Sequence, residues 1–221
     1  MAHPVTEIAY LPIKDGVDLN EGDSKRIWDA TLHTISQQSG FKSLRWGVQI
    51  EHPGVAQMAI EWDSIDAHRA FTSAPSYTPF LESLDPLLSA PPHIFHLSLP
   101  PSPHAGSSPF DAPVTECVSL YFDPATPPSA YDASFAAFVA EGAKVTGVVP
   151  TGMIGGWGVE AQKADDEGEE MRFFGVFIGW ESVQAHMDFR ASKEFPGVAK
   201  YLREGVGKAK MHHVALKRYG A

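Results

Sequence analysis

The 221-residue sequence carries a formal net charge of −10 and is 43% hydrophobic, with 11% aromatic residues. This composition supports a buried core, and the negative charge opposes nucleic-acid binding because no cluster of Lys and Arg offsets it. No apolar run is long enough to cross a bilayer, and the single cysteine, Cys117, excludes an internal disulfide. We therefore expect a cytoplasmic protein with neither a membrane nor a nucleic acid as partner.

An internal repeat organises the chain. Three segments of the first half return in the same order in the second half. Pro4-Val-Thr-Glu-Ile-Ala-Tyr-Leu returns as Pro113-Val-Thr-Glu-Cys-Val-Ser-Leu, Arg45-Trp-Gly-Val as Gly156-Trp-Gly-Val, and Trp62-Asp-Ser-Ile-Asp-Ala-His-Arg-Ala-Phe as Trp180-Glu-Ser-Val-Gln-Ala-His-Met-Asp-Phe. The repeat predicts two domains built alike.

A segment rich in proline and small polar residues separates the two copies. Residues 100–113 read PPSPHAGSSPFDAP, a composition that sustains neither a helix nor a strand ladder. We therefore predict an N-terminal domain at 1–100, a linker at 101–112 and a C-terminal domain at 113–221.

Within each half, the apolar periodicity alternates between strand-like and helical. In chain order, the first half predicts a strand at 6–13, a helix at 21–39, a hairpin of strands at 44–50 and 55–62, helical turns from 64 to about 88, and a strand at 93–99. The second half predicts a strand at 115–122, a helix at 129–141, strands at 153–161 and 171–180, a helical stretch at 182–206 and a strand at 209–219. Each half is thus a βαββαβ unit.

The predicted strand at 171–180 is apolar on both of its faces. Such a strand needs cover on both sides, from helices on one side and from a second sheet on the other. We therefore expect an α+β fold of two ferredoxin-like βαββαβ domains, whose four-stranded antiparallel sheets pack face to face within one chain.

The segment Trp-Asp/Glu-Ser-x-x-Ala-His-x-x-Phe joins the third strand to the second helix in each half. It resembles the dimeric α+β barrel superfamily, most closely the antibiotic-biosynthesis monooxygenase and stress-responsive A/B barrel branches. That superfamily includes cofactor-free oxygenases, polyketide cyclases, isomerases, haem enzymes and proteins without known activity. The resemblance implies that the two halves pair with each other, in a monomer with an internal pseudo-dimer or in a homodimer.

His68 and His186 occupy the same position in the two copies, four residues after a serine that is a predicted helix cap. Both lie on the apolar stripe of the helix that should face the sheet. An imidazole in that position can act as a general acid or base near neutral pH, so both are candidate catalytic residues. The alternative is a buried histidine, hydrogen-bonded to the backbone, that holds the helix in place.

Four tryptophans are candidate ligand-binding residues. Trp62 and Trp180 end the third strands, and Trp46 and Trp157 lie on the second strands. Their rings could line an aromatic site, and the alternative is that all four fill the core.

In the quinone-forming monooxygenases that the chain resembles, the strand-end tryptophan works with a tyrosine and an asparagine. Here His68 and His186 stand at the tyrosine position, and Met58 and Val176 stand at the asparagine position. The polyketide cyclases that the chain resembles carry a catalytic histidine that would fall around Tyr77 or Phe195 here. Phenylalanine cannot transfer a proton, and we add Tyr77 to the candidate ligand-binding residues.

The remaining histidines form two pairs in the last strands, His93 with His96 and His212 with His213. Residues that are three apart or adjacent on a strand point to opposite faces, so neither pair chelates a metal alone. One member of each pair can reach a cavity, and His213 joins the candidate ligand-binding residues. His93 and His212 occupy similar places in their strands. We expect no metal and no cofactor.

The run Gly152-Met-Ile-Gly-Gly-Trp-Gly158 is rich in glycine, and Gly156 and Gly158, on one face of the strand, leave space above the sheet unfilled. This pattern predicts that a ligand cavity is larger in the C-terminal half. The alternative is a bulge or a bend that closes the barrel.

Together, these features predict a protein that binds a small, apolar, aromatic or polyketide-like molecule in a pocket between sheet and helices. It would oxidise or cyclise this molecule as a cofactor-independent monooxygenase or polyketide cyclase. One alternative is a non-catalytic ligand-binding or stress-related barrel, in which every tryptophan and histidine is structural. A second alternative is a haem-binding enzyme, since some haem enzymes of the superfamily fuse two such units.

Overall fold

The computed structural model of the protein describes residues 3–100, 108–145, 150–165 and 167–220. The chain divides into two compact units. The first contains the chain up to Ser98 together with the chain from Lys217 onward, and the second contains Leu99–Leu216. Within the described ranges, no helix combines the length and the apolar character that crossing a membrane requires.

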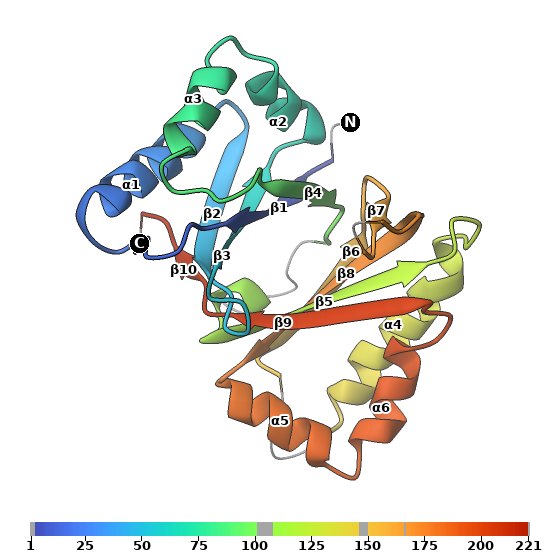
Figure 1. The fold of residues 1–221 in the computed structure, drawn as a ribbon. Helices are drawn as coiled ribbons and strands as arrows, with labels where there is room; N and C mark the ends of the chain where they lie inside the picture. Colours follow the sequence, from blue (N-terminus) through green and yellow to red (C-terminus); the bar gives the residue numbers. More distant parts are fainter. Residues whose placement is uncertain (1–2, 101–107, 146–149, 166, 221) are drawn as a thin grey trace. The chain divides into compact units, whose positions relative to one another are not determined.

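The first unit is an antiparallel sheet with helices on one face (Figure 1). Its strands lie in the spatial order β10-β2-β3-β1-β4. In chain order, its elements are β1 (Val5–Pro12), α1 (Gly22–Ser36), β2 (Phe41–Val48), β3 (Val55–Trp62), α2 (Ile65–Thr72), α3 (Tyr77–Leu84), β4 (His93–Leu97) and β10 (Lys217–Arg218).

The second unit repeats this design, with strands in the order β6-β8-β5-β9 and the short β7 paired with β8. Its α-helices also lie on one face of its sheet (Figure 1). In chain order, its elements are the 3-10 helix η1 (Pro109–Asp111), β5 (Val114–Phe122), α4 (Ser129–Gly142), β6 (Gly152–Trp157), β7 (Gln162–Lys163), β8 (Glu170–Trp180), α5 (Val183–Ala191), α6 (Phe195–Leu202) and β9 (Lys208–Val214).

The predicted α+β class and the βαββαβ order are confirmed in both units. The predicted serine caps are confirmed as well. Ser64 accepts a hydrogen bond from the backbone N–H of Ala67, and Ser182 accepts one from that of Ala185. In each copy, the second helical stretch is divided into two short helices, α2 and α3 or α5 and α6. The face-to-face pairing of the two sheets stays a prediction.

The core of the first unit lies between its sheet and its helices. Trp28, Leu32 and Ile35 recur at helical spacing on α1, and all three are buried. They pack on strand residues such as Trp46, whose ring lies edge-on to Trp28 with centroids 5.1 Å apart. Burial of each large side chain contributes about 1.5–3 kcal/mol, which fixes the helical layer on the sheet.

The strand β8 is buried on both faces over residues 173–180, as its apolar sequence predicted. On one face, Phe177 packs against Phe110 of η1, with ring centroids 4.7 Å apart. The helix η1 approaches so closely that a Cβ on Gly179 would lie 2.8 Å from the Cβ of Ala112. The end of the predicted linker is therefore a packed part of the C-terminal unit, while residues 101–107 lie outside the described residues.

The predicted last strand at 209–219 is wrong as a single strand. The strand β9 pairs with β5, whereas β10 pairs with β2 in the other sheet, with Lys217 opposite Trp46. The Nζ of Lys217 lies 3.8 Å from the centroid of the Trp46 ring, and the Tyr219 N–H donates to the Leu44 carbonyl over 2.9 Å. Residues from Lys217 onward thus group with the N-terminal unit, not with the domain predicted at 113–221.

Candidate functional site

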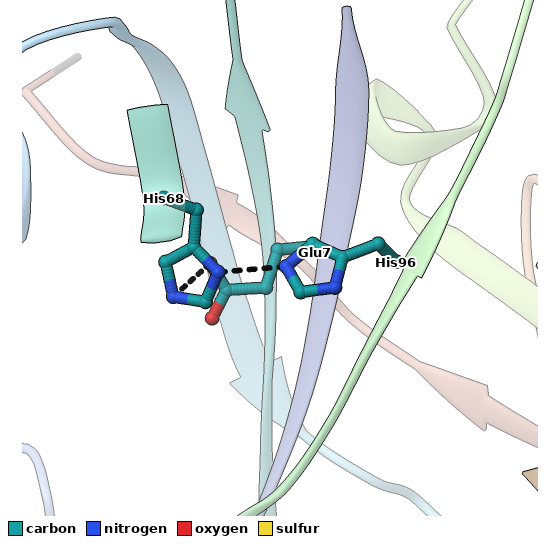
Figure 2. Close-up of side chains that lie close together, drawn as sticks. All are labelled: Glu7, His68 and His96. Carbon is teal, nitrogen blue, oxygen red and sulfur yellow. Dashed lines mark hydrogen bonds and ion pairs between the residues drawn. The ribbon is translucent and has the colours of Figure 1, made fainter. Parts of the chain in front are cut away.

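Three buried polar side chains meet on the helix-covered face of the first sheet. The antiparallel register of β1 and β4 sets Glu7 directly opposite His96, and α2 brings His68 above them. The Nδ1 of His68 lies 2.7 Å from the Nε2 of His96, and the Nε2 of His68 lies 3.4 Å from the Oε2 of Glu7 (Figure 2). The two ring nitrogens of His68 thus face two different partners.

Trp62 holds this group from the end of β3. Its indole N–H donates to the Oε2 of Glu7 over 2.7 Å, and its ring stacks on the His68 imidazole with centroids 5.2 Å apart. Trp62 is only 1% exposed. The carboxylate is therefore oriented by a donor that has no access to solvent, as the groups that support a catalytic side chain usually are.

Burial controls the protonation of the carboxyl group. Desolvation raises the pKa of Glu7 from 4.5 to about 7, against the opposing effects of the Trp62 hydrogen bond and of His96. Burial also raises the pKa of Tyr77, with a smaller contribution from Glu7. Glu7 is thus a buried acid that exchanges its proton near neutral pH.

The second unit contains the same arrangement. The indole N–H of Trp180 donates to the Oε2 of Glu116 over 2.9 Å, the Nδ1 of His186 lies 2.8 Å from the Nε2 of His213, and the Nε2 of His186 lies 3.4 Å from Glu116. The four residues are all buried. Because the two groups share one geometry, a substitution in one unit can be compared with the equivalent substitution in the other unit as a matched control.

A cavity of about 40 Å³ lies between the sheet and the helices of the first unit. Glu7, Trp62 and His68 line one side of it, and nearly all of the remaining lining is apolar. The volume admits a few waters, whereas a cavity of about 150 Å³ holds a benzene ring. Tyr77 and Phe80 of α3, both half-buried, form part of the wall and would have to move to admit a ring.

Of the other predicted site residues, two lie at the cavity or in a polar group and two lie elsewhere. Tyr77 lines the cavity of the first unit, and His213 is the partner of His186. Trp46 is buried in the core beneath Lys217. Trp157 is half-buried, donates to Asp132 over 2.9 Å and packs on Phe174. Trp46 and Trp157 therefore lie away from the two polar groups.

Glu7, Glu116 and His96 were missed as site residues. Both glutamates stand in the repeated Pro-Val-Thr-Glu segment, where a charged side chain at a core-facing position of a buried strand was the available signal. His96 was missed because the two last strands were aligned on His93 and His212. The ladders instead set His96 against Glu7 and His213 against Glu116.

The glycine-rich run ends at an open pocket of about 460 Å³ in the second unit, which is lined by Trp157, Gly158 and Phe173, while the cavity beside Glu7 lies in the first unit. A Cβ on Gly155 would lie 2.6 Å from the Phe135 ring and 2.7 Å from the Phe174 ring. The missing side chain of Gly155 is therefore replaced by aromatic packing, whereas the open pocket lies beside Gly158. Binding of a ligand in that pocket stays a prediction.

This arrangement can perform two kinds of chemistry. A carboxylate and an imidazole at the edge of an apolar cavity can remove a proton from a bound molecule and return it. Two imidazoles and a carboxylate whose ligand atoms lie within 4.8 Å of one another can also hold a metal ion.

The element order and the sheet topology define a tandem α+β protein, in which two βαββαβ units each contain a buried polar group of the same geometry. Three solved structures illustrate the similarity. An anthrone oxidase-like protein is 15% identical, with a TM-score of 0.67 over 99% of this chain and 94% of that chain. A "putative monooxygenase" from Lactobacillus acidophilus NCFM is 13% identical, with a TM-score of 0.58 over 98% of this chain and 95% of that chain. SnoaB, a cofactor-independent oxygenase from Streptomyces nogalater, is 17% identical over 42% of this chain and 92% of that chain, with a TM-score of 0.35.

At these identities, the likeness shows the fold alone. No family model matches the sequence, and no curated protein matches it.

Proposed function

We propose that the protein binds a small, apolar, aromatic molecule in the cavity of the first unit and oxidises it as a cofactor-independent monooxygenase. One observation carries this proposal: Glu7 and His68 lie together at one side of an otherwise apolar cavity. An apolar cavity with few polar groups binds an apolar ring and fixes its orientation. Glu7 and His68 would then face the carbon of the bound molecule that carries its most acidic proton.

The proposed reaction starts with a proton transfer. A substrate with a CH₂ group activated by an aromatic ring and a carbonyl, as in an anthrone, gives one proton to the Glu7 carboxylate, beside which His68 lies. The resulting carbanion is oxidised by O₂, so that the CH₂ becomes a C=O and the other oxygen atom leaves as water. The two electron pairs come from the substrate, and no bound cofactor takes part. Trp62 holds the Oε2 of Glu7 and so fixes the orientation of the carboxylate.

The comparisons support the choice of reaction class at the level of the fold. One protein with this fold over its whole length is anthrone oxidase-like. Because one fold serves many reactions, Glu7 and His68 carry the proposal and the fold only makes it reasonable. A cytoplasmic location is part of the proposal, and a sequence whose single cysteine, Cys117, is buried fits it.

The test uses anthrone as a probe and measures oxygen consumption and the anthraquinone formed. We expect turnover by the wild-type protein, a loss of at least about 100-fold in Glu7→Gln, as is typical when an acid or base is removed, and little change in Glu116→Gln. Glutamine keeps an oxygen that accepts from the tryptophan, so both variants should fold. Turnover that survives in Glu7→Gln would refute the assignment of the base.

A second candidate function is that of a non-catalytic barrel, and the duplication favours it, because the same hydrogen bonds occur in both units. A structural role predicts that Glu7→Gln and Glu116→Gln lower the free energy of unfolding by similar amounts, with no turnover in any variant. Binding of anthrone without oxidation, measured by calorimetry, would assign a ligand-binding barrel.

A further inference from the structure

The three residues Glu7, His68 and His96 come from three different elements, β1, α2 and β4. Each offers one ligand atom, and these atoms all lie within 4.8 Å of one another (Figure 2). All three side chains are buried, at 4%, 6% and 7% exposure. The positions of such side chains are set by the packing of the core, so the group is formed before any ligand arrives.

We propose that Glu7, His68 and His96 form a binding site for a divalent transition-metal ion of the Zn²⁺ or Co²⁺ type. Imidazole nitrogen suits zinc, cobalt, copper and iron, whereas Ca²⁺ and Mg²⁺ require oxygen ligands. Two histidines and one carboxylate are a ligand set of catalytic zinc sites, which keep a fourth position for water.

The distances permit the ion after a small adjustment. In a tetrahedral zinc site with bonds of about 2.0–2.1 Å, neighbouring ligand atoms lie about 3.3 Å apart. The Nδ1 of His68 and the Nε2 of His96 lie 2.7 Å apart, so the two rings must separate by roughly half an ångström and turn toward a shared point. His96 lies at the buried end of β4, and His68 lies on the short helix α2. A small shift of α2 can supply this movement.

Three features around the group favour an ion. The cavity borders Glu7 and His68 and has room for the water that would complete the coordination. The Trp62 N–H holds the Oε2 of Glu7, as an outer partner holds a carboxylate ligand. A cation also neutralises a carboxylate that is otherwise expensive to bury in ionised form.

The ion and a transferable proton are alternatives at these atoms, because metal ligands bind through the lone pairs that a proton would take. A bound ion would therefore inhibit the proton transfer suggested above. Metal uptake is measured without a substrate, however, so this inference stands or falls independently of the proposed function.

The experiment measures Zn²⁺ bound at equilibrium to chelator-treated protein and repeats the titration with Co²⁺, whose visible absorption reports tetrahedral nitrogen and oxygen ligands. The background is His213→Gln, which removes the equivalent histidine of the second unit and leaves the first unit intact. We expect this variant to bind one equivalent at the first-unit site, and His96→Gln/His213→Gln to bind one equivalent fewer.

Glu7→Gln in the same background provides a second variant, in case His96→Gln does not fold. Circular dichroism checks the fold of each protein. Equal Zn²⁺ uptake by His213→Gln and by a folded variant lacking His96 or Glu7 overturns the proposal, and so does the absence of uptake by His213→Gln.

Discussion

The indole nitrogen of Trp62 donates a hydrogen bond of 2.7 Å to the carboxylate of Glu7, across two strands that pair directly in the sheet. The bond joins residues 55 positions apart in the chain. It keeps a carboxylate in a core that would otherwise exclude it, and it orients one oxygen toward His68. The strand-end tryptophan, a candidate ligand-binding residue from the sequence, is thus the support of the polar group.

Glu7 should make the stability of the protein fall as the pH rises between about 4.5 and 7. The pKa of the Glu7 carboxyl is about 7 in the folded protein, whereas its ordinary value of 4.5 applies to the unfolded chain. Between these two pH values, the folded protein retains a proton that the unfolded chain releases. The stabilisation is complete below the lower value and is lost as the pH rises through the upper one, with a slope of up to about 1.4 kcal/mol per pH unit.

Glu7→Gln removes this titration. Urea unfolding of both proteins at several pH values, in buffer with a chelator, should show a difference in free energy that changes across this window in favour of the variant at higher pH. His68, His96 and Tyr77 face the same group and remain in both proteins. A constant difference from pH 4.5 to 7 would contradict the raised pKa of Glu7.

Tyr77→Ala should enlarge the cavity of the first unit. Tyr77 lines it and packs edge-on against Phe71, with ring centroids 5.2 Å apart. Because Tyr77 is half-buried, we expect a loss of about 1–3 kcal/mol in the free energy of unfolding, less than for a fully buried ring. The additional space should accept a small apolar probe such as benzene, detected as a rise in melting temperature on addition of the probe.

The matched control is Phe195→Ala. Phe195 occupies the corresponding place in the second unit, edge-on to Phe189 with centroids 5.7 Å apart. Its removal should lower stability without producing a benzene effect at the first-unit cavity. A benzene effect as large as that of Tyr77→Ala would show that α3 is not the wall that limits entry.

Gly155→Ala should destabilise the second unit by about 1–3 kcal/mol, the usual cost of overpacking a core. The added methyl would lie within 2.9 Å of ring atoms of both Phe135 and Phe174. Gly197→Ala, in α6 of the same unit, meets nothing within 4 Å and should be neutral or stabilising by up to about 1 kcal/mol. Denaturant unfolding of the two variants compares them, and an unchanged midpoint for Gly155→Ala would reject close packing on β6.

Removal of the chain after Leu216 should loosen the edge of the first sheet. The truncation deletes β10, the contact of Lys217 with Trp46 and the hydrogen bond from Tyr219 to Leu44. Loss of these contacts should cost about 1–3 kcal/mol and raise amide exchange in β2. Lys217→Gln, which keeps the strand, should cost less than about 1 kcal/mol. Unchanged exchange in β2 after truncation would mean that β10 contributes nothing to that edge.

The repeat and the alternation of periodicities were enough to predict the α+β class and the helices and strands of both copies. They work because helix and strand periods reflect which side chains face the core, and this pattern is written locally. The prediction went wrong at 209–219, where a strand continues into a second sheet. A local pattern carries no information about which sheet edge is free to accept a strand, and only the ladder from Lys217 to Trp46 reveals it.

Within the candidate site, the sequence supplied Trp62, His68 and their copies in the second half, since all stand in a visible motif. It did not supply Glu7 or His96, because a glutamate in a strand is ordinarily interpreted as solvent-facing and two histidines on one strand offer no joint geometry. Their meeting depends on the register of β1 with β4, which is set by the packing of the whole sheet.

The sequence by itself therefore determined the two copies, their class of fold and the residue types available for chemistry. The tertiary structure decided which of these residues meet, which of their groups borders an apolar cavity and where the last strand pairs. The physical reason is that burial and hydrogen-bond partnership belong to pairs of residues far apart in the chain, such as Glu7 and Trp62, and these pairs exist only once the sheet has formed.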